Sequence, residues 1–260
     1  MLILLEENYP MKISFTKRQY ISFASVVFML LIWKLLSLYF KSDFILPSPE
    51  KTLVTTIELF VDKGFLATVG ITMARGIIGF FLSLILGLSL GIWAGINANF
   101  SAFLKPILVT IRSTPVIAVI LLALIWLNTN AVPVFIALLT MFPFICTNVI
   151  DGIKSVDGNL TQMATFYKVS HWRIVREVYV PAIMPFIISG ASSAMGIGWR
   201  AIIIGEVLSQ PQYGIGTVMQ SAQTFLKVDA VIAWTLIAVV ISYLFEKVIR
   251  WSEKRIVVWK

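Results

Sequence analysis

The chain has 260 residues, of which 58% are apolar and only 13% are charged, and its mean hydropathy is +0.90. A soluble domain carries about 25% charged residues, so this composition excludes a water-soluble globule and also a disordered chain. The sequence therefore predicts an all-α membrane protein. The net charge of +8 is explained by membrane topology, and we expect no nucleic-acid partner.

Apolar runs of about 20 residues, the length that a helix needs to cross about 30 Å of hydrocarbon, occur six times. They cover residues 21–40, 66–95, 104–127, 132–150, 181–206 and 229–249. The first lacks a small-x-small cleavage site before Phe40, so we expect an uncleaved helix and not a secretion signal. The stretch after Met11 resembles an ordinary start, and translation begins at either Met1 or Met11.

The basic residues of the loops predict the orientation of the six spans. With both termini in the cytoplasm, fourteen Lys and Arg fall in inside segments and four in outside segments. Cytoplasmic loops are the ones that collect basic residues. We therefore predict a cytoplasmic segment at 1–20, a first helix and external loop at 21–65, a transmembrane domain at 66–250 and a cytoplasmic tail at 251–260.

Small residues recur every four positions in two of the predicted spans. Helices in lipid associate where small residues allow their backbones to approach closely, so each ladder predicts a packing groove. The ladders are Gly87, Gly91 and Gly95 in the second span and Gly190, Ala194 and Gly198 in the fifth.

Ionisable residues within spans are costly and are functional candidates by default. Lys34 and Arg75 have long stems, and we expect both to reach an interface. Arg200 lies deep in the fifth span, and Glu206 follows six residues later, a spacing that does not place the two on one helix face. Either residue lines a path for an anionic or zwitterionic solute, or pairs with another helix to fix the bundle.

The longest connection on the predicted cytoplasmic side is Asp151 to Val180. Residues 159–167 are predicted to form a short helix and residues 171–180 a second one, stopped by Pro181. The pair presents Phe166, Tyr167 and Trp172, which is more typical of a docking surface than of a catalytic site.

This connection resembles the cytoplasmic loop of the permease subunits of type I ABC importers. The family signature is Glu-Ala-Ala, three residues, Gly, nine residues, Ile, one residue and Leu-Pro. The chain has Gln162-Met163-Ala164, Lys168, Val178 and Val180-Pro181 at the same spacing. Further stretches resemble the sulfonate, taurine, nitrate and thiamine-precursor branch, among them Leu46-Pro47-Ser48-Pro49, Arg112 with Pro115, Phe142-Pro143 and Trp199-Arg200-Ala201.

The resemblance implies an importer subunit of the inner membrane that works with several partners. These are a second permease copy, an external solute-binding protein and a separate ATPase that binds ATP and Mg, so that this chain binds no cofactor. The chain itself has no Walker-type phosphate loop. The loop at 159–180 would dock on the ATPase through Gln162, Met163, Ala164, Lys168, Ser170, Trp172 and Pro181.

The loop departs from the family pattern at three of these positions. Gln162 replaces an acid, Met163 replaces an alanine, and Lys168 replaces a glycine that adopts left-handed conformations cheaply, which lysine does not. We expect a partner ATPase whose groove has adapted to these changes, although weakened coupling is the alternative.

Two other classes of membrane protein are less consistent with the sequence. An intramembrane enzyme needs a nucleophile with a base, paired acids or metal ligands at membrane depth. The chain has one histidine, His171, in a loop and one cysteine, Cys146, so we expect no catalytic residue and no metal site. An ion-driven secondary transporter commonly repeats its topology and carries midplane acids. The six predicted spans have no evident repeat and no mid-span acid, which argues against this class. It remains the alternative function.

Overall fold

The computed structural model describes residues 17–256, and all regular structure in this range is helical. The choice between Met1 and Met11 lies outside the described residues, as do residues 1–16 of the predicted N-terminal segment and residues 257–260 of the predicted tail. The elements are α1 (Lys17–Phe40), α2 (Pro49–Val61), α3 (Phe65–Ile96), α4 (Ala98–Ser113), α5 (Val116–Trp126), α6 (Val132–Lys154), α7 (Gly158–Phe166), α8 (His171–Ile174), a π-helical segment η1 (Val175–Tyr179), α9 (Val180–Ser209), α10 (Ile215–Thr224) and α11 (Val228–Ile256).

The predicted span at 104–127 is divided into two helices, α4 and α5. Five stretches of the described chain are long and apolar enough to cross a membrane: Tyr20–Phe40, Phe65–Ile96, Val132–Lys154, His171–Ser209 and Val228–Ile249. In the sixth region, α4 and α5 meet at 96°. The cause is Pro115, which forces Thr114 into an extended conformation with φ −73° and ψ 129°. The two halves make a sixth span only if they cross together.

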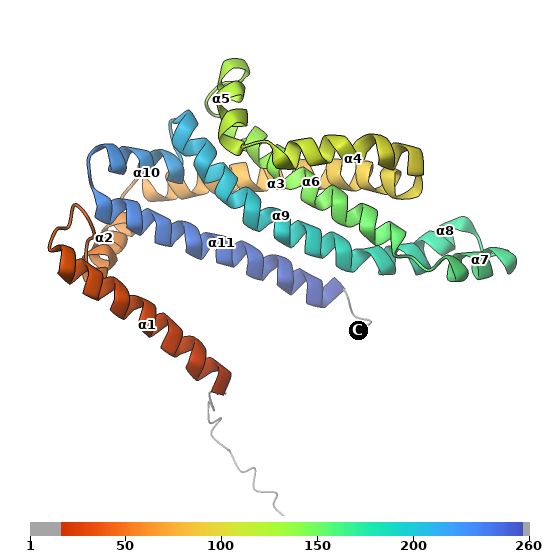
Figure 1. The fold of residues 1–260 in the computed structure, drawn as a ribbon, viewed down its shortest axis with the longest axis horizontal. Helices are drawn as coiled ribbons and strands as arrows, with labels where there is room; N and C mark the ends of the chain where they lie inside the picture. The colour runs from red at the N-terminus through yellow and green to blue at the C-terminus, as the bar shows by residue number, and fades with distance from the viewer. Residues whose placement is uncertain (1–16, 257–260) are drawn as a thin grey trace, which may run out of the picture.

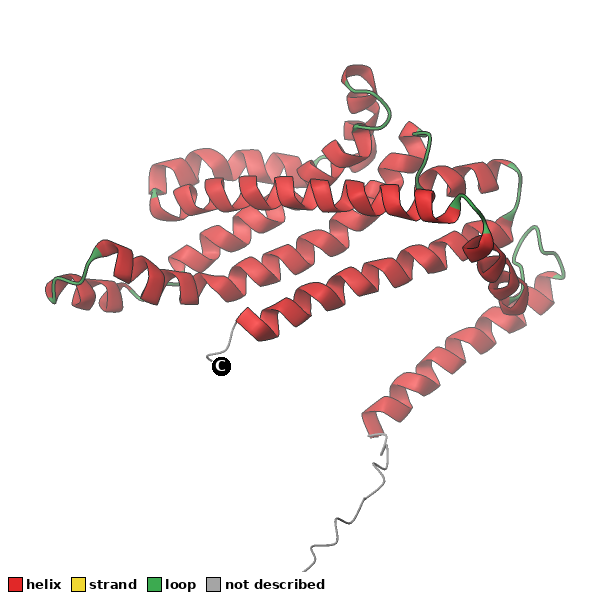
Figure 2. Cartoon of the chain, turned by 180° about the vertical axis from the view of Figure 1, so that it is seen from behind, coloured by secondary structure: helices red, strands yellow, loops and turns green. Residues whose placement is uncertain are grey.

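The long helices α3, α6, α9 and α11 run side by side, with α4 beside them (Figure 1). The loop helices α7 and α8 lie at one end, and α2 and α10 lie at the other; α5 stands nearly perpendicular to the bundle. Seen from behind, α1 diverges from the body (Figure 2). The N-terminal end of α1 and the C-terminal end of α11 both point toward the end that carries α7 and α8.

Helix α6 is the centre of the bundle, and both small-residue ladders face it. A Cβ atom built on Gly91 would lie 2.8 Å from Cβ of Val149, and equivalent atoms on Gly87 and Gly95 would lie 2.7 Å from Ile145 and Ile153. On α9, a Cβ at Gly190 would lie 2.7 Å from Asn148, a Cβ at Gly198 would overlap Met141, and Ala194 is fully buried. The backbones of α3 and α9 therefore approach α6 too closely for larger side chains.

The second loop helix does not stop at Pro181, contrary to the sequence prediction. From His171 to Ser209 the chain is one continuous helical stretch of 39 residues. In η1 the Val180 amide donates to the Val175 carbonyl, five residues back. This wider π turn directly before Pro181 lets the helix continue past a residue that lacks an N–H and would crowd a regular turn.

Helix α1 joins the body through α2. The indole Nε1 of Trp33 donates to the Pro47 carbonyl at 3.1 Å, and Nζ of Lys34 lies 2.8 Å from a Glu50 carboxylate oxygen. This hydrogen bond from Lys34 lowers the pKa of Glu50 below its ordinary value. Within residues 20–40 the one buried side chain is Ser37.

Candidate functional site

The loop end of the molecule presents a largely exposed surface. Met163, Phe166, Tyr167 and Trp172 are 54%, 83%, 72% and 76% exposed. Gln162, Lys168 and Ser170 are also exposed, whereas Ala164 and Pro181 are half-buried. We call the exposed side chains of residues 162–172 the loop surface. An apolar, aromatic surface of this kind is typical of a protein contact.

A tight turn after α7 sets the shape of the loop surface. Asp157 caps the start of α7 by accepting from the Asn159 amide at 2.8 Å. At its end, the Val169 amide donates to Ala164 and the Lys168 amide to Thr165, both at 3.0 Å. This Schellman pattern needs a left-handed residue after the helix, where glycine is usual. Lys168 takes that conformation with φ +54°.

A buried polar cluster lies at the opposite end of the bundle. Nη1 of Arg75 in α3 is 2.6 Å from Oε1 of Glu206 in α9, and the Thr72 hydroxyl donates to both Glu206 oxygens at 2.9 and 3.0 Å. Arg75 is 6% exposed and Glu206 is 0% exposed. The expectation that Arg75 reaches an interface is therefore wrong, since its guanidinium is enclosed and paired.

The same cluster holds in place the connections at that end of the bundle. The amide of Gly216 donates to Glu206 at 2.9 Å, so this carboxylate caps the N-terminus of α10, a position where negative charge is favoured. Arg75 also donates to the Tyr213 carbonyl at 2.7 Å and to Asn130 at 3.0 Å. Of the two roles considered for Glu206, the contacts correspond to pairing with another helix.

The sequence contains a signal for this pair, which becomes visible only when the two spans are considered together. A charged residue in a span usually pairs with another one, and Arg75 and Glu206 are oppositely charged members of two apolar runs. The spacing rule applied to Arg200 and Glu206 concerns one helix only, and it says nothing of partners on other helices.

Arg200 lies apart from the cluster. Its side chain is exposed and makes no hydrogen bond or ion pair with any residue that the structure describes. It lines a cavity between α9 and α11, together with Thr235, Ser242 and Tyr243. Its role in a translocation path stays a prediction.

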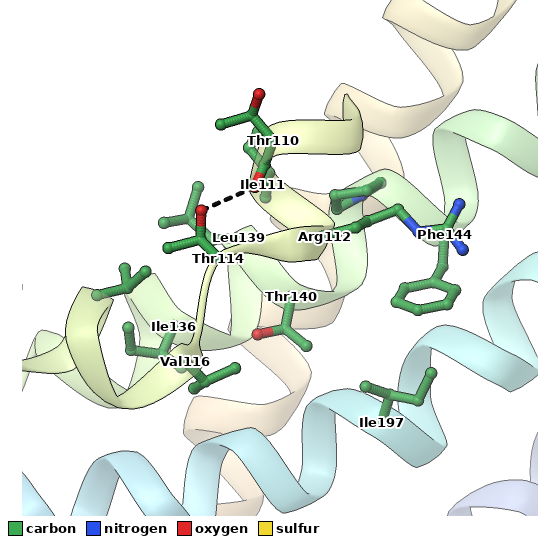
Figure 3. Close-up of a pocket in the computed structure, with 12 residues that line it drawn as sticks. Thr110, Ile111, Arg112, Thr114, Val116, Ile136, Leu139, Thr140, Phe144 and Ile197 are labelled. Carbon is green, nitrogen blue, oxygen red and sulfur yellow. Dashed lines mark hydrogen bonds between the residues drawn. The ribbon is translucent and has the colours of Figure 1, made fainter. Parts of the chain in front are cut away.

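A cavity of about 270 Å³ occupies the angle between α4 and α5 (Figure 3). Four helices contribute to it. Arg112 comes from the end of α4, Val116 from α5, Thr140 and Phe144 from α6, and Ile197 from α9. The Arg112 guanidinium carbon lies 4.8 Å from the centroid of the Phe144 ring. We call this the bend cavity.

A second cavity of about 310 Å³ lies on the loop side of Arg112, between α4 and α6. It shares Arg112 with the bend cavity and also contains Lys105, Asp151 and Lys154. We call this second space the basic cavity.

No group of three or more His, Cys, Asp or Glu residues suited to a metal ion occurs within residues 17–256.

The chain is similar to a known family of transport proteins. Residues 87–258 match the family model described as "Binding-protein-dependent transport system inner membrane component". The putative aliphatic sulfonates transport permease protein of Bacillus subtilis is 28% identical, over 88% of this chain and 83% of its own length. The taurine transport system permease protein of Escherichia coli is 25% identical, over 87% and 84%.

Two further similarities agree with this placement. The bicarbonate transport system permease protein of Synechococcus elongatus is 25% identical over 89% of this chain and 87% of its own length. The solved inward-facing structure of the MetNI methionine ABC transporter covers 74% of this chain and 94% of the matched chain, with a TM-score of 0.60 and 17% identity, which supports the fold. The family predicted from the loop spacing is confirmed: the chain belongs to the inner-membrane components of binding-protein-dependent transport systems, and it is a permease subunit of an ABC importer.

Proposed function

We propose that two copies of this chain form a path for a small anionic solute across the inner membrane. An external binding protein delivers the solute, and a separate ATPase drives transport by docking on the loop surface. The printed names of the relatives favour this solute class, because aliphatic sulfonates and bicarbonate are anions and taurine carries a sulfonate group.

The observation that carries the coupling proposal is the continuous helical stretch from His171 to Ser209. At about 1.5 Å per residue it is about 58 Å long. One end carries Trp172 of the loop surface, and the other carries Glu206, which caps α10. A displacement imposed on the loop surface is therefore passed to the external connections through one stiff element.

The orientation that this proposal needs has independent support. The N-terminal end of α1 and the C-terminal end of α11 point to the same end as α7 and α8. Among residues 17–256, the segments at that end carry more Lys and Arg than the connections at the opposite end. The positive-inside rule then favours a cytoplasmic loop surface and two cytoplasmic termini. A soluble ATPase would have access to the loop surface only in this orientation.

The test is uptake by the assembled transporter in proteoliposomes that contain the chain, its ATPase and its binding protein. ATP-dependent accumulation of ethanesulfonate, taurine or bicarbonate is expected. Trp172→Ala and Phe166→Ala should each lower uptake at least tenfold by removing exposed contact residues, while Trp126→Ala, an exposed aromatic on α5, serves as the control. Uptake that needs an ion gradient and no ATPase would support a secondary transporter instead.

Arg200 belongs to the same experiment. Because it is exposed, unpaired among the described residues and borders the cavity between α9 and α11, we expect Arg200→Ala to lower anion uptake several-fold with assembly intact. Unchanged uptake would remove Arg200 from the path.

A further inference from the structure

Arg112, an exposed residue in the last turn of α4, differs from the buried Arg75 in having no protein acceptor. The donors of Arg75 are occupied by Glu206, Tyr213 and Asn130. Arg112 contacts the face of the Phe144 ring, and its guanidinium makes no hydrogen bond or ion pair with the described residues. An aromatic face orients a guanidinium without using its N–H groups. Arg112 is thus held in place with its donors available.

The surroundings of Arg112 suit an anion that carries a short apolar group. Thr140 points into the bend cavity (Figure 3), and its hydroxyl has no hydrogen-bond partner in the described structure. Most of the remaining lining is apolar, including Val119, Leu139 and Ile197. A volume of about 270 Å³ lies just below the range of about 300–1,000 Å³ for drug-sized ligands, which suits a smaller solute.

The basic cavity extends this arrangement toward the loop end of the bundle. It adds the cations Lys105 and Lys154 to the shared Arg112, and Asp151 is its one acid. Lys154 is held by a 3.1 Å hydrogen bond to Ser101. The positive charge of the two cavities together therefore exceeds the negative charge, and it continues from the bend to the cytoplasmic end of α4 and α6.

We propose that Arg112 binds the oxyanion head of the transported solute in the bend cavity, with Thr140 as a second donor, and that Lys105 and Lys154 line its way to the cytoplasm. The planar guanidinium matches a sulfonate or carboxylate with two parallel hydrogen bonds. The apolar walls take a short alkyl chain. This assignment rests on the proposed function and names the residues by which the path selects anions.

The experiment measures charge selectivity at the cavity in the complete complex in nanodiscs. In a Cys146→Ala background, a cysteine is placed at Ile197, which lines the bend cavity, or at Thr235, which lines the cavity beside Arg200. Each is labelled with an anionic sulfonatoethyl methanethiosulfonate and with its cationic trimethylammonium counterpart. The ratio of the two rates reports the local preference for an anion and cancels the intrinsic reactivity of the thiol.

At position 197 we expect the anionic-to-cationic ratio to fall at least tenfold on Arg112→Gln, and Arg112→Lys to keep part of it. Ethanesulfonate at millimolar concentration should slow labelling at 197 only when Arg112 is present. The ratio at 235 should not respond to Arg112→Gln. An unchanged ratio at 197, with no protection by ethanesulfonate, overturns the assignment.

Two further arms separate the remaining outcomes. Labelling at position 197 could instead be slowed by phosphatidylglycerol and not by ethanesulfonate in phosphatidylcholine nanodiscs. That result would assign the site to a lipid headgroup and overturn its assignment to the solute. In proteoliposomes, Arg112→Gln should lower ATP-driven ethanesulfonate uptake at least tenfold, with ATPase assembly retained. If the complex with the original sequence shows no ATP-driven uptake, the proposed function is contradicted. If the Arg112→Gln complex shows full uptake, only the role of Arg112 is contradicted.

Discussion

At the scale of single residues, the Arg75–Glu206 pair owes its stability to the number of its partners. Two charges removed from water lose several kcal/mol each in solvation, and their attraction offsets this only when the remaining donors and acceptors are also satisfied. Here Thr72, Gly216 and Tyr213 provide those bonds. The pair thereby joins α3, α9 and the connection to α10 in one unit.

We predict that Glu206→Gln destabilises the chain by about 3–5 kcal/mol, because the enclosed Arg75 charge loses its counter-ion. The free energy of unfolding, measured by SDS titration in mixed micelles, checks this. Arg75→Met combined with Glu206→Leu should cost less than the two single changes added together. A loss below about 1 kcal/mol for Glu206→Gln would mean that water or another group neutralises Arg75.

Lys168 holds a strained backbone conformation that the turn after α7 requires. A non-glycine residue in the left-handed region costs about 1–2 kcal/mol, and Lys168 has φ +54°. We expect Lys168→Gly to stabilise the turn by about 1 kcal/mol, seen as slower hydrogen exchange of the Lys168 and Val169 amides. Lys168→Val, β-branched and more strained, should speed that exchange and lower uptake per ATP hydrolysed. Equal exchange in all three forms would contradict a strained turn.

Sequence reasoning succeeded for residues whose environment is set by their own helix and failed for those set by another. The ladders of Gly87 and Gly190 follow from spacing within one helix, and both face α6. Arg75 was assigned to an interface because its long stem permits that position, while its partner lies 131 residues away in the chain. The bend cavity was missed for the same reason, since its lining comes from four helices.

At the scale of elements, two breaks in regular helix determine where the cavities and the loop surface lie. Hydropathy averaged over a window detects apolar length but does not register direction. The sequence thus indicates at Pro115 a bend or a span start, but not a turn of 96°. Conversely, Pro181 indicated a helix end that did not occur, because the π turn of η1 accommodates it. Each proline acts through the conformation of the residues before it.

The contact between α3 and α6 gives a matched pair of tests within one helix. A Cβ at Gly91 would lie 2.8 Å from Val149, whereas a Cβ at Gly70 would have nothing within 4 Å. Gly91→Ala should therefore cost about 1–3 kcal/mol by overpacking, while Gly70→Ala should be neutral or stabilise by up to about 1 kcal/mol. Unfolding titrations of the two variants check both values. Equal effects at Gly70 and Gly91 would show that close approach is not the cause.

At the scale of the whole molecule, the two ends of the bundle differ in their side chains. The loop surface offers exposed apolar and aromatic side chains, while the opposite end is fixed by the buried cluster around Glu206. The bend cavity and the basic cavity lie along the bundle between them. In the proposed function, docking occurs at one end and solute entry at the other. The length of α9 would then separate the two events, and coupling between them would require α9 to be rigid.

The proposed docking of an ATPase requires that the loop surface face the cytoplasm, which single-cysteine labelling can test in the Cys146→Ala background. Asn159→Cys in α7 and Gln212→Cys, in the connection between α9 and α10, lie at opposite ends. In intact spheroplasts, a membrane-impermeant maleimide should label Gln212→Cys and leave Asn159→Cys unmodified. Inside-out vesicles should show the reverse. Labelling of Asn159→Cys from outside would invert the topology, and an ATPase in the cytoplasm would then have no access to the loop surface.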